Sequence, residues 1–304
     1  VMAYGFFFGR FRLWVNRTDY TSSDLPAAFD GYRVVHISDL HLSTFDDRPA
    51  ALQRVVDSIN ALQPDLICFT GDLVTMGVAE AQPYILILRG LRATDGVVSV
   101  LGNHDLLIYS HLPEEQRLAE VERLCAFERD TLGWQLLRNQ HLTIKRSTNA
   151  PTDIQTLTDT DPTDIQPPTV TDTPTPQTLT IIGVDNSSCD GQGFRTIYSG
   201  DLPQALQGTD GFRLLLSHDP SQWMAEIVDR TPVSLTLSGH THAGQVRLFG
   251  HALSDLMFHE SAGWYKHGIQ SLYVNEGIGC TAPIRINCPS EITLITLHAL
   301  SEEN

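Results

Sequence analysis

Five short blocks of potential metal ligands recur along the sequence. In chain order they are Asp39-Leu40-His41, Gly71-Asp72, Gly102-Asn103-His104-Asp105, Ser217-His218-Asp219 and Gly239-His240-Thr241-His242. Their carboxylate, amide and imidazole groups are ligands that first-row divalent cations accept, and no thiolate is required. Any one block alone is more typical of a turn, a helix cap or a packed histidine. All five together favour a metal centre.

Each block follows an apolar segment with the pattern of a buried strand. The strands are predicted within GYRVVHIS, DLICFTG, GVVSVLG, FRLLLS and PVSLTLS, and helices are predicted across PAALQRVVDSINALQ and PYILILRGLRA. Asp39, Asp72 and Asn103 are then spaced by 33 and 31 residues, the length of one βαβ crossover each. Because ligand sites of open α/β sheets lie at the carboxyl ends of strands, the five blocks are expected to meet there.

Residues 147–178 interrupt this alternation of strands and helices. The stretch is dominated by Thr, Pro, Asp and Gln, and the sequence PTDIQ occurs in it twice. A segment of this composition cannot bury enough apolar surface to become ordered. We therefore expect a disordered insertion between two strands of one domain that spans residues 31–304.

The composition argues against one class of partner. The 304 residues carry a formal net charge of −16, and only two of them are lysines, Lys145 and Lys266. Nucleic-acid binders ordinarily present a basic stripe to the phosphates, so no nucleic-acid partner is expected. Cys280 and Cys288 lie close enough in sequence to pair in an oxidising compartment, but free thiols are expected because a chain of this length needs no disulfide.

Residues 1–30 are predicted to form a separate N-terminal segment. VMAYGFFFG is apolar but too short to span a bilayer. In a helix, Phe7, Phe11 and Trp14 would share one face. Three arginines follow the apolar stretch, namely Arg10, Arg12 and Arg17. Two interpretations stay open: a membrane-interface anchor with the catalytic domain on the cytoplasmic face, or packing onto the core of a soluble or exported protein.

The five blocks resemble the motif set of the calcineurin-like metallophosphoesterase superfamily, which runs DxH, GD, GNHD, H and GHxH. This chain has DLH, GD, GNHD, the histidine of SHDP, and GHTH, so each element is intact. The resemblance covers residues 32–300 without the insertion. GHTHAGQ and the later VNEGIG and PIRINCPSEITLITL are similar to a membrane-linked phosphodiesterase branch of the superfamily.

This resemblance implies an α/β fold, a four-layer αββα sandwich of two mixed β-sheets flanked by helices. It also implies two divalent metal ions, which Mn²⁺, Fe or Zn²⁺ would satisfy. His104 would act as general acid or orient the phosphate, and Asp105 would hold His104 through a hydrogen bond. The ligands would be, for the first ion, Asp39, His41 and His242, and for the second, Asn103, His218 and His240, with Asp72 bridging the two.

The sequence says less about the substrate. Arg285 in PIRIN would contact a phosphate or form a surface ion pair, and Glu276 stands where this branch is expected to have a basic residue. The resemblance implies hydrolysis of a phosphodiester or pyrophosphate, in a lipid-linked nucleotide such as UDP-2,3-diacylglucosamine or in a small soluble diester. The alternative is an inactive, metal-stabilised scaffold that binds a protein partner. The intact ligands and His104 disfavour that alternative.

Overall fold

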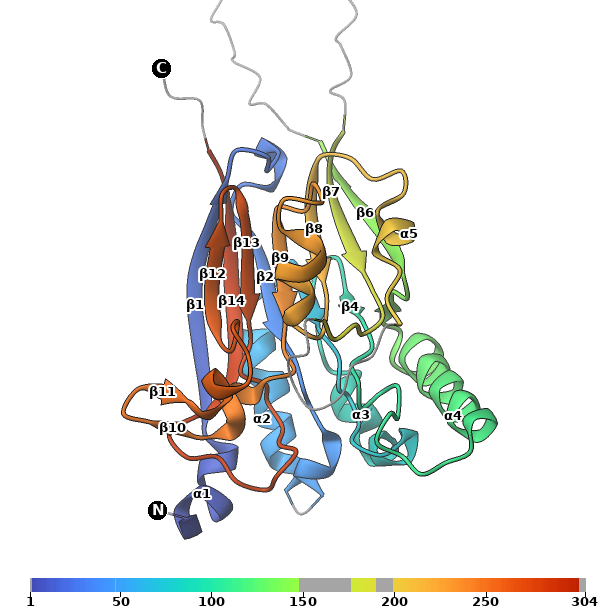
Figure 1. Cartoon of the computed structure of the whole chain (residues 1–304), viewed down its shortest axis with the longest axis vertical. Coiled ribbons are helices and arrows are strands. Elements are labelled where there is room, and N and C mark those ends of the chain that lie inside the picture. The colour runs from blue at the N-terminus through green and yellow to red at the C-terminus, as the bar shows by residue number, and fades with distance from the viewer. Residues whose placement is uncertain (1, 47, 148–175, 190–198, 301–304) are drawn as a thin grey trace, which may run out of the picture.

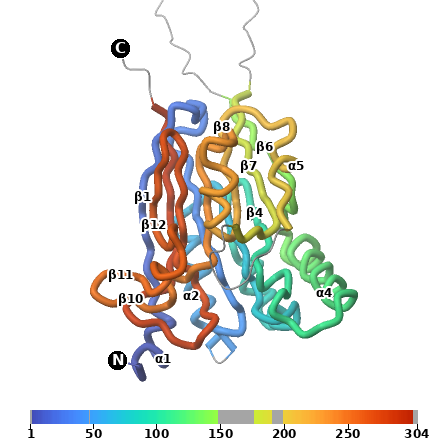
Figure 2. Tube along the Cα trace, in the orientation of Figure 1, coloured from blue at the N-terminus to red at the C-terminus, as the bar shows by residue number. Residues whose placement is uncertain are grey.

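The computed structural model describes residues 2–46, 48–147, 176–189 and 199–300. Two six-stranded sheets pack against each other, and helices lie on their outer sides (Figures 1 and 2). The predicted insertion at 147–178 falls largely outside the described residues. Within its predicted boundaries, however, a strand already begins at Gln177.

The first sheet is mixed, with the strand order β1-β14-β2-β3-β4-β5. The strands β2 to β5 are parallel, β14 is antiparallel to β2, and β1 is parallel to β14. In this order the bounds are Leu13–Ser22, Ser290–Ala299, Tyr32–Ile37, Leu66–Phe69, Val97–Ser99 and Gln135–Leu136. The central parallel strands are short and buried on both faces, which explains their continuous apolar sequences.

The second sheet has the order β12-β13-β9-β8-β7-β6. Its four central strands are parallel, and both edge strands, β12 and β6, are antiparallel to their neighbours. In this order the bounds are Gly263–His267, Gln270–Val274, Leu235–Ser238, Phe212–Leu216, Gln177–Gly183 and Gln140–Arg146. Because β2, β3, β4, β8 and β9 are each followed by one of the five blocks, both sheets contribute loops to one site.

Alternate strand residues fill two different cores. In β3, Leu66 and Cys68 belong to the core between the sheets, whereas Ile67 and Phe69 pack with the outer helices. The helices α2 (Pro49–Ala61) and α3 (Ile85–Leu88) cover the first sheet in this way. On the second sheet, α5 (Leu202–Leu206) and the turn Trp223–Ile227 cover the outer face. The predicted four-layer αββα sandwich is confirmed.

The local sequences of two helices, α2 and α4, explain where they form. α2 has Pro49 at its first turn, which suits the fixed φ of proline, and it buries one apolar face that includes Leu52, Val55 and Ile59. α4 (Glu114–Ala126) has acidic residues in its first turn and Arg123 in its last, as the helix dipole favours. It packs beside β5.

The N-terminal segment differs from the prediction. α1 (Met2–Phe7) ends before Phe8, and a 3-10 turn at Gly9–Phe11 follows it. β1 then pairs with β14 along all ten of its residues, so the predicted boundary at residue 30 divides the first sheet. Phe7, Phe11 and Trp14 therefore share no helical face: Phe7 is exposed, Phe11 packs with Phe45, and Trp14 lies on β1. None of the helices in the described ranges has the length and apolar character needed to cross a bilayer.

Candidate metal centre

The five blocks form tight loops at the ends of their strands. Five of the expected ligands have left-handed backbone conformations, with φ of 53° at Asp39, 38° at His41, 59° at Asp72, 71° at His240 and 51° at His242. Such values are uncommon outside glycine and persist where the surrounding structure enforces them. A side chain in place of Gly102 would overlap the carboxylate of Asp72, so this position requires glycine.

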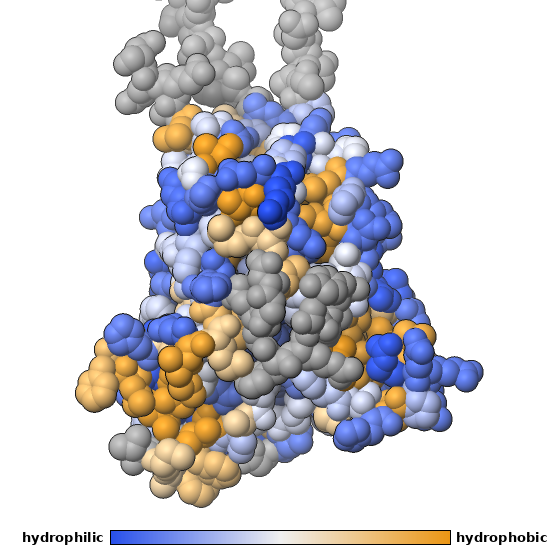
Figure 3. Space-filling model, in the orientation of Figure 1, coloured by the Kyte–Doolittle hydropathy of each residue, from blue (hydrophilic) through white to orange (hydrophobic). Residues whose placement is uncertain are grey.

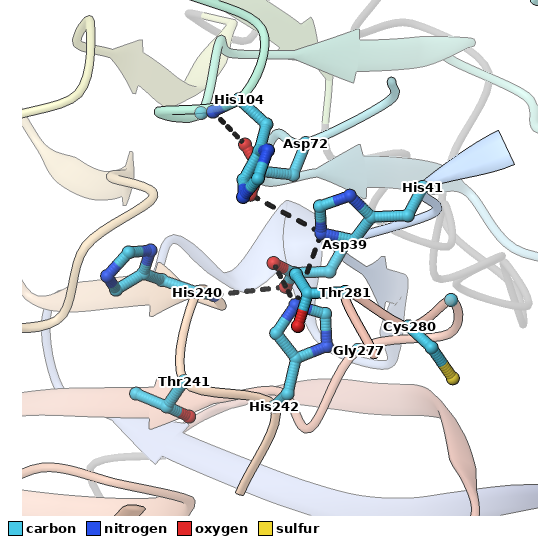
Figure 4. A network of polar contacts seen from close by, with 12 residues as sticks. Asp39, His41, Asp72, His104, His240, Thr241, His242, Gly277, Cys280 and Thr281 are labelled. Atoms are coloured by element: carbon cyan, nitrogen blue, oxygen red, sulfur yellow. Dashed lines mark hydrogen bonds and ion pairs between the residues drawn. The ribbon is translucent and has the colours of Figure 1, made fainter. Parts of the chain in front are cut away.

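Asp39, His41 and His242 converge on one point (Figure 4). The Nε2 atoms of His41 and His242 are 3.2 Å apart, and Nε2 of His242 is 3.3 Å from Oδ1 of Asp39. That carboxylate oxygen is buried and accepts no hydrogen bond from the described residues. A buried carboxylate oxygen left in this state beside an imidazole nitrogen fits a cation ligand.

A second group brings together Asn103, His218 and His240. Oδ1 of Asn103 is 2.9 Å from Nε2 of His218 and 2.7 Å from Nδ1 of His240, and these two ring nitrogens are 3.2 Å apart. Three ligand atoms thus face one another, with Asn103 and His218 buried and His240 partly buried. The chemistry of this donor set also suits a first-row divalent cation.

Asp72 lies between the two groups. Its Oδ2 is 3.5 Å from Nε2 of His41 on one side and 3.3 Å from Nε2 of His218 on the other. Its second oxygen, Oδ1, accepts a hydrogen bond of 2.8 Å from the backbone N–H of His104 (Figure 4). The carboxylate is therefore held so that Oδ2 faces both groups.

The remaining ring nitrogens are oriented by outer partners, as is usual for histidines that bind metals. The Nδ1–H of His218 donates to the carbonyl of Thr70 at 2.7 Å, and Nδ1 of His41 hydrogen-bonds to Thr75 at 3.1 Å. Nε2 of His240 is 3.5 Å from the buried carboxylate of Asp219. The sequence analysis gave Asp219 no role, although it directly follows His218 in the SHDP block.

His104 lies beside the metal centre, and its ring is perpendicular to that of His41. Its Nδ1–H donates to the carbonyl of Thr75 at 3.1 Å, which leaves Nε2 as its second functional atom. The side chain lines a cavity of about 480 Å³ that adjoins the centre and also includes Tyr109. Its ring is thus fixed at the place where a substrate has access.

Asp105 does not hold His104, so this prediction is wrong. Its carboxylate instead accepts four backbone N–H groups, from Asp72 at 2.7 Å, Leu73 at 2.9 Å, Val74 at 3.2 Å and Gly102 at 3.0 Å. Asp105 thereby joins the loop after β3 to the loop after β4. The residue that it positions is Asp72.

The position of Arg285 agrees with neither prediction from the sequence, a phosphate contact or a surface ion pair. It is 1% exposed, so it forms no surface ion pair, and it does not line the cavity. Its guanidinium donates to the carbonyls of Glu276, Gly277 and Gly279 and lies 3.4 Å from Nδ1 of His242. Arg285 supports the loop behind His242 and does not meet the substrate side of the site. Cys280 and Cys288 are free thiols, as expected.

The pKa values of the histidines in this site suit the binding of a cation. Burial lowers the pKa of His41 to about 3 and that of His242 far below its usual value, so both are neutral ligands. Burial would also lower the pKa of His218, but the carboxylates of Asp72 and Asp39 raise it to about 10. A protonated His218 places positive charge beside Asp72, whereas burial raises the pKa of Asp39.

We expect metal binding to release this proton. At pH 8, below the pKa of about 10, metal-free His218 is protonated, and a cation at Nε2 must displace about one proton per chain. Calorimetric titration with Mn²⁺ in two buffers of different protonation enthalpy measures the number released. His218→Gln should release fewer protons, and apparent affinity should fall as the pH is lowered. Equal heats in both buffers would contradict the prediction.

Comparison with known proteins agrees with this geometry. The family model of calcineurin-like phosphoesterases matches residues 32–244. The chain is 29% identical to the uncharacterized metallophosphoesterase YkuE of Bacillus subtilis, over 94% of this chain and 86% of that protein. It is 29% identical to the UDP-2,3-diacylglucosamine pyrophosphatase LpxG of Chlamydia trachomatis, over 93% and 88%.

A vertebrate relative is longer. The chain is 30% identical to a transmembrane protein with metallophosphoesterase domain from Danio rerio, over 90% of this chain, but it spans only 54% of that protein. The family match covers most of the domain, and the residues that it includes form the buried cluster of histidines and aspartates described above. The chain therefore belongs to the calcineurin-like phosphoesterase family and is a metal-dependent phosphoesterase.

Proposed function

We propose that the protein hydrolyses a phosphodiester or pyrophosphate bond with the help of two divalent metal ions. The observation that carries this proposal is the position of Asp72, whose Oδ2 faces both ligand groups. One ion would be held by Asp39, His41 and His242, the other by Asn103, His218 and His240, and Asp72 would be shared. The ligand types are compatible with Mn²⁺, Fe or Zn²⁺.

The ligand set limits the negative charge of the site. Two bound divalent cations would neutralise phosphate oxygens and lower the pKa of a water molecule held between them. Asp39 and Asp72 are the only carboxylates in the proposed ligand set, and Asn103 contributes a neutral oxygen. With both cations bound, the site would therefore carry a net positive charge, which favours an anionic substrate.

His104 is proposed to deliver the proton that the leaving group needs. Its Nδ1–H is engaged by the carbonyl of Thr75, so the ring cannot turn without losing this hydrogen bond. A proton held at Nε2 is then directed to the oxygen atom that leaves the phosphorus. Asp105 acts indirectly, because it fixes the loop that carries Asp72.

A membrane-proximal location is part of the proposal. Met2, Phe7 and Phe8 in and after α1 are 67%, 54% and 60% exposed, and exposed apolar side chains, two of them aromatic, suit a membrane interface. The nearby arginines favour an anionic, cytoplasmic leaflet. A lipid-linked nucleotide substrate has support only from the name of the Chlamydia relative.

The first prediction concerns Asp72. Asp72→Asn should lose most of the bound metal and most of the activity, since a neutral amide cannot offset the repulsion between two cations. Metal content is measured by elemental analysis, and activity by a screen of monoesters, diesters and nucleotide anhydrides with Mn²⁺ supplied. Asp57→Asn, the same change on the exposed side of α2, is the matched control. Full activity after exhaustive chelation would refute the two-metal proposal.

The second prediction concerns His104. His104→Gln should keep near-normal metal content and lower turnover by roughly 10²–10⁴-fold, the usual effect of losing a general acid. The loss should be smaller for a p-nitrophenyl ester, whose leaving group needs little protonation. An equal loss for good and poor leaving groups would assign His104 to phosphate positioning. A loss of metal would make it a ligand.

The third prediction concerns membranes. The parent protein should sediment with vesicles of anionic lipid at low salt, and Phe7→Ser with Phe8→Ser should weaken this binding severalfold. Both side chains are exposed, so the variant should keep the melting temperature of the parent. Leu86→Ser removes an 84% exposed side chain from α3 and serves as control. If the parent protein does not sediment with anionic vesicles, the membrane proposal is wrong.

A further inference from the structure

The cavity beside the metal centre is chemically two-sided. Part of its lining consists of the proposed ligands and His104. Six of the other lining residues form an apolar wall, namely Val246, Leu253, Met257, Phe258, Ala282 and Ile284. At about 480 Å³ the cavity is within the range of small-molecule sites. It has room for more than the phosphate group that is cleaved.

The apolar wall continues to the surface of the molecule. Leu253 and Met257 line the cavity, yet they are 51% and 38% exposed. Leu253 follows directly on the two-stranded ribbon of β10 (Arg247–Leu248) and β11 (His251–Ala252), where Leu248 and Phe249 are exposed. Figure 3 shows apolar side chains gathered over this end of the molecule, which also carries α1. An apolar chain that leaves the cavity past Leu253 and Met257 would thus meet further exposed apolar side chains on this ribbon.

Positive charge near this wall is already neutralised. Arg247 follows Val246 in the chain, but its guanidinium forms an ion pair with the buried carboxylate of Glu276 and donates to the carbonyl of Gly250. Arg285 is occupied by backbone carbonyls. Of the described residues that line the cavity, none is a lysine or an arginine. A second phosphate would thus find no cationic side chain there.

We propose that the cavity binds an amphiphilic phosphoester that carries a single phosphate and an alkyl or acyl chain, with the chain lying along the wall from Val246 to Ile284. The proposal rests on the proposed phosphoesterase activity and narrows its substrate class. The cavity should favour a diester with one phosphate and an apolar chain over a nucleotide diphosphate. The metal centre recognises the phosphate, and burial of each methylene group against the wall adds to binding.

A chain-length series tests the proposal directly. The metal-loaded enzyme is assayed with methyl, butyl and hexyl esters of p-nitrophenyl phosphate, all below the concentration at which micelles form. Burial predicts that kcat/KM rises roughly two- to fourfold per methylene, or roughly thirtyfold and more from methyl to hexyl. Because the leaving group is the same throughout, the chemical step does not change along the series. Equal kcat/KM for methyl and hexyl esters would overturn the proposal.

Variants locate the chain. Leu253→Ser combined with Met257→Ser should lower the hexyl-to-methyl ratio of kcat/KM by about tenfold. Leu256→Ser changes an 82% exposed residue of the same turn that does not line the cavity, and it should leave the ratio as in the parent. All these side chains are partly exposed, so the variants should fold, and melting temperature and metal content verify this. An unchanged ratio in the double variant would overturn the proposed location.

The single phosphate is tested by competition. Hexyl monophosphate and hexyl diphosphate should inhibit hydrolysis of the p-nitrophenyl ester with inhibition constants within about threefold of each other. A diphosphate that binds tenfold more tightly would overturn this part of the proposal. Failure of the proposed function has a different signature, because the metal-loaded enzyme would then hydrolyse none of the esters, the methyl ester included.

Discussion

Two carboxylates buried side by side dominate the physics of this molecule. Asp39 and Asp72 are at most 1% exposed, and removing both from water is unfavourable unless positive charge compensates them. His218, whose pKa the two carboxylates raise to about 10 against the effect of burial, supplies part of this positive charge, and burial raises the pKa of Asp39. The two divalent cations that we propose would replace the proton on His218 and supply more charge. The loops between strands and helices are arranged to make that exchange possible.

Holding the ligands before any cation is bound requires support from the surrounding structure. The left-handed conformations at Asp39, Asp72 and His240 cost free energy, and backbone hydrogen bonds offset this cost. Asp105 ties two loops together through four N–H groups, and Arg285 binds the carbonyls of the loop behind His242. Neither residue faces the substrate side. Both are buried polar groups whose hydrogen bonds fix the positions of these loops.

The sequence predicts which histidines and aspartates come together because these signals are local. Each block follows a strand with a clear apolar pattern, so the strand end and the ligand are specified by neighbouring residues. The role of Arg285 could not be predicted, since its carbonyl partners are set by the path of a folded loop. β1 was missed because Phe7, Phe11 and Trp14 have helical spacing, whereas its partner β14 lies at the other end of the chain. Pairing with β14 therefore determined the structure of this segment, and the local helical spacing did not.

The distribution of charge links substrate recognition to metal loading. With a net charge of −16, the protein as a whole does not attract a phosphate ester, and screening limits the reach of any attraction to about 8 Å at physiological ionic strength. Arg247 is neutralised by Glu276, and Arg285 is enclosed by carbonyls. The described part of the cavity therefore has no permanent cation, and the metal ions become its source of positive charge. In our proposal, discrimination between phosphoesters then depends on the uncharged groups of the lining, of which the apolar wall is one part.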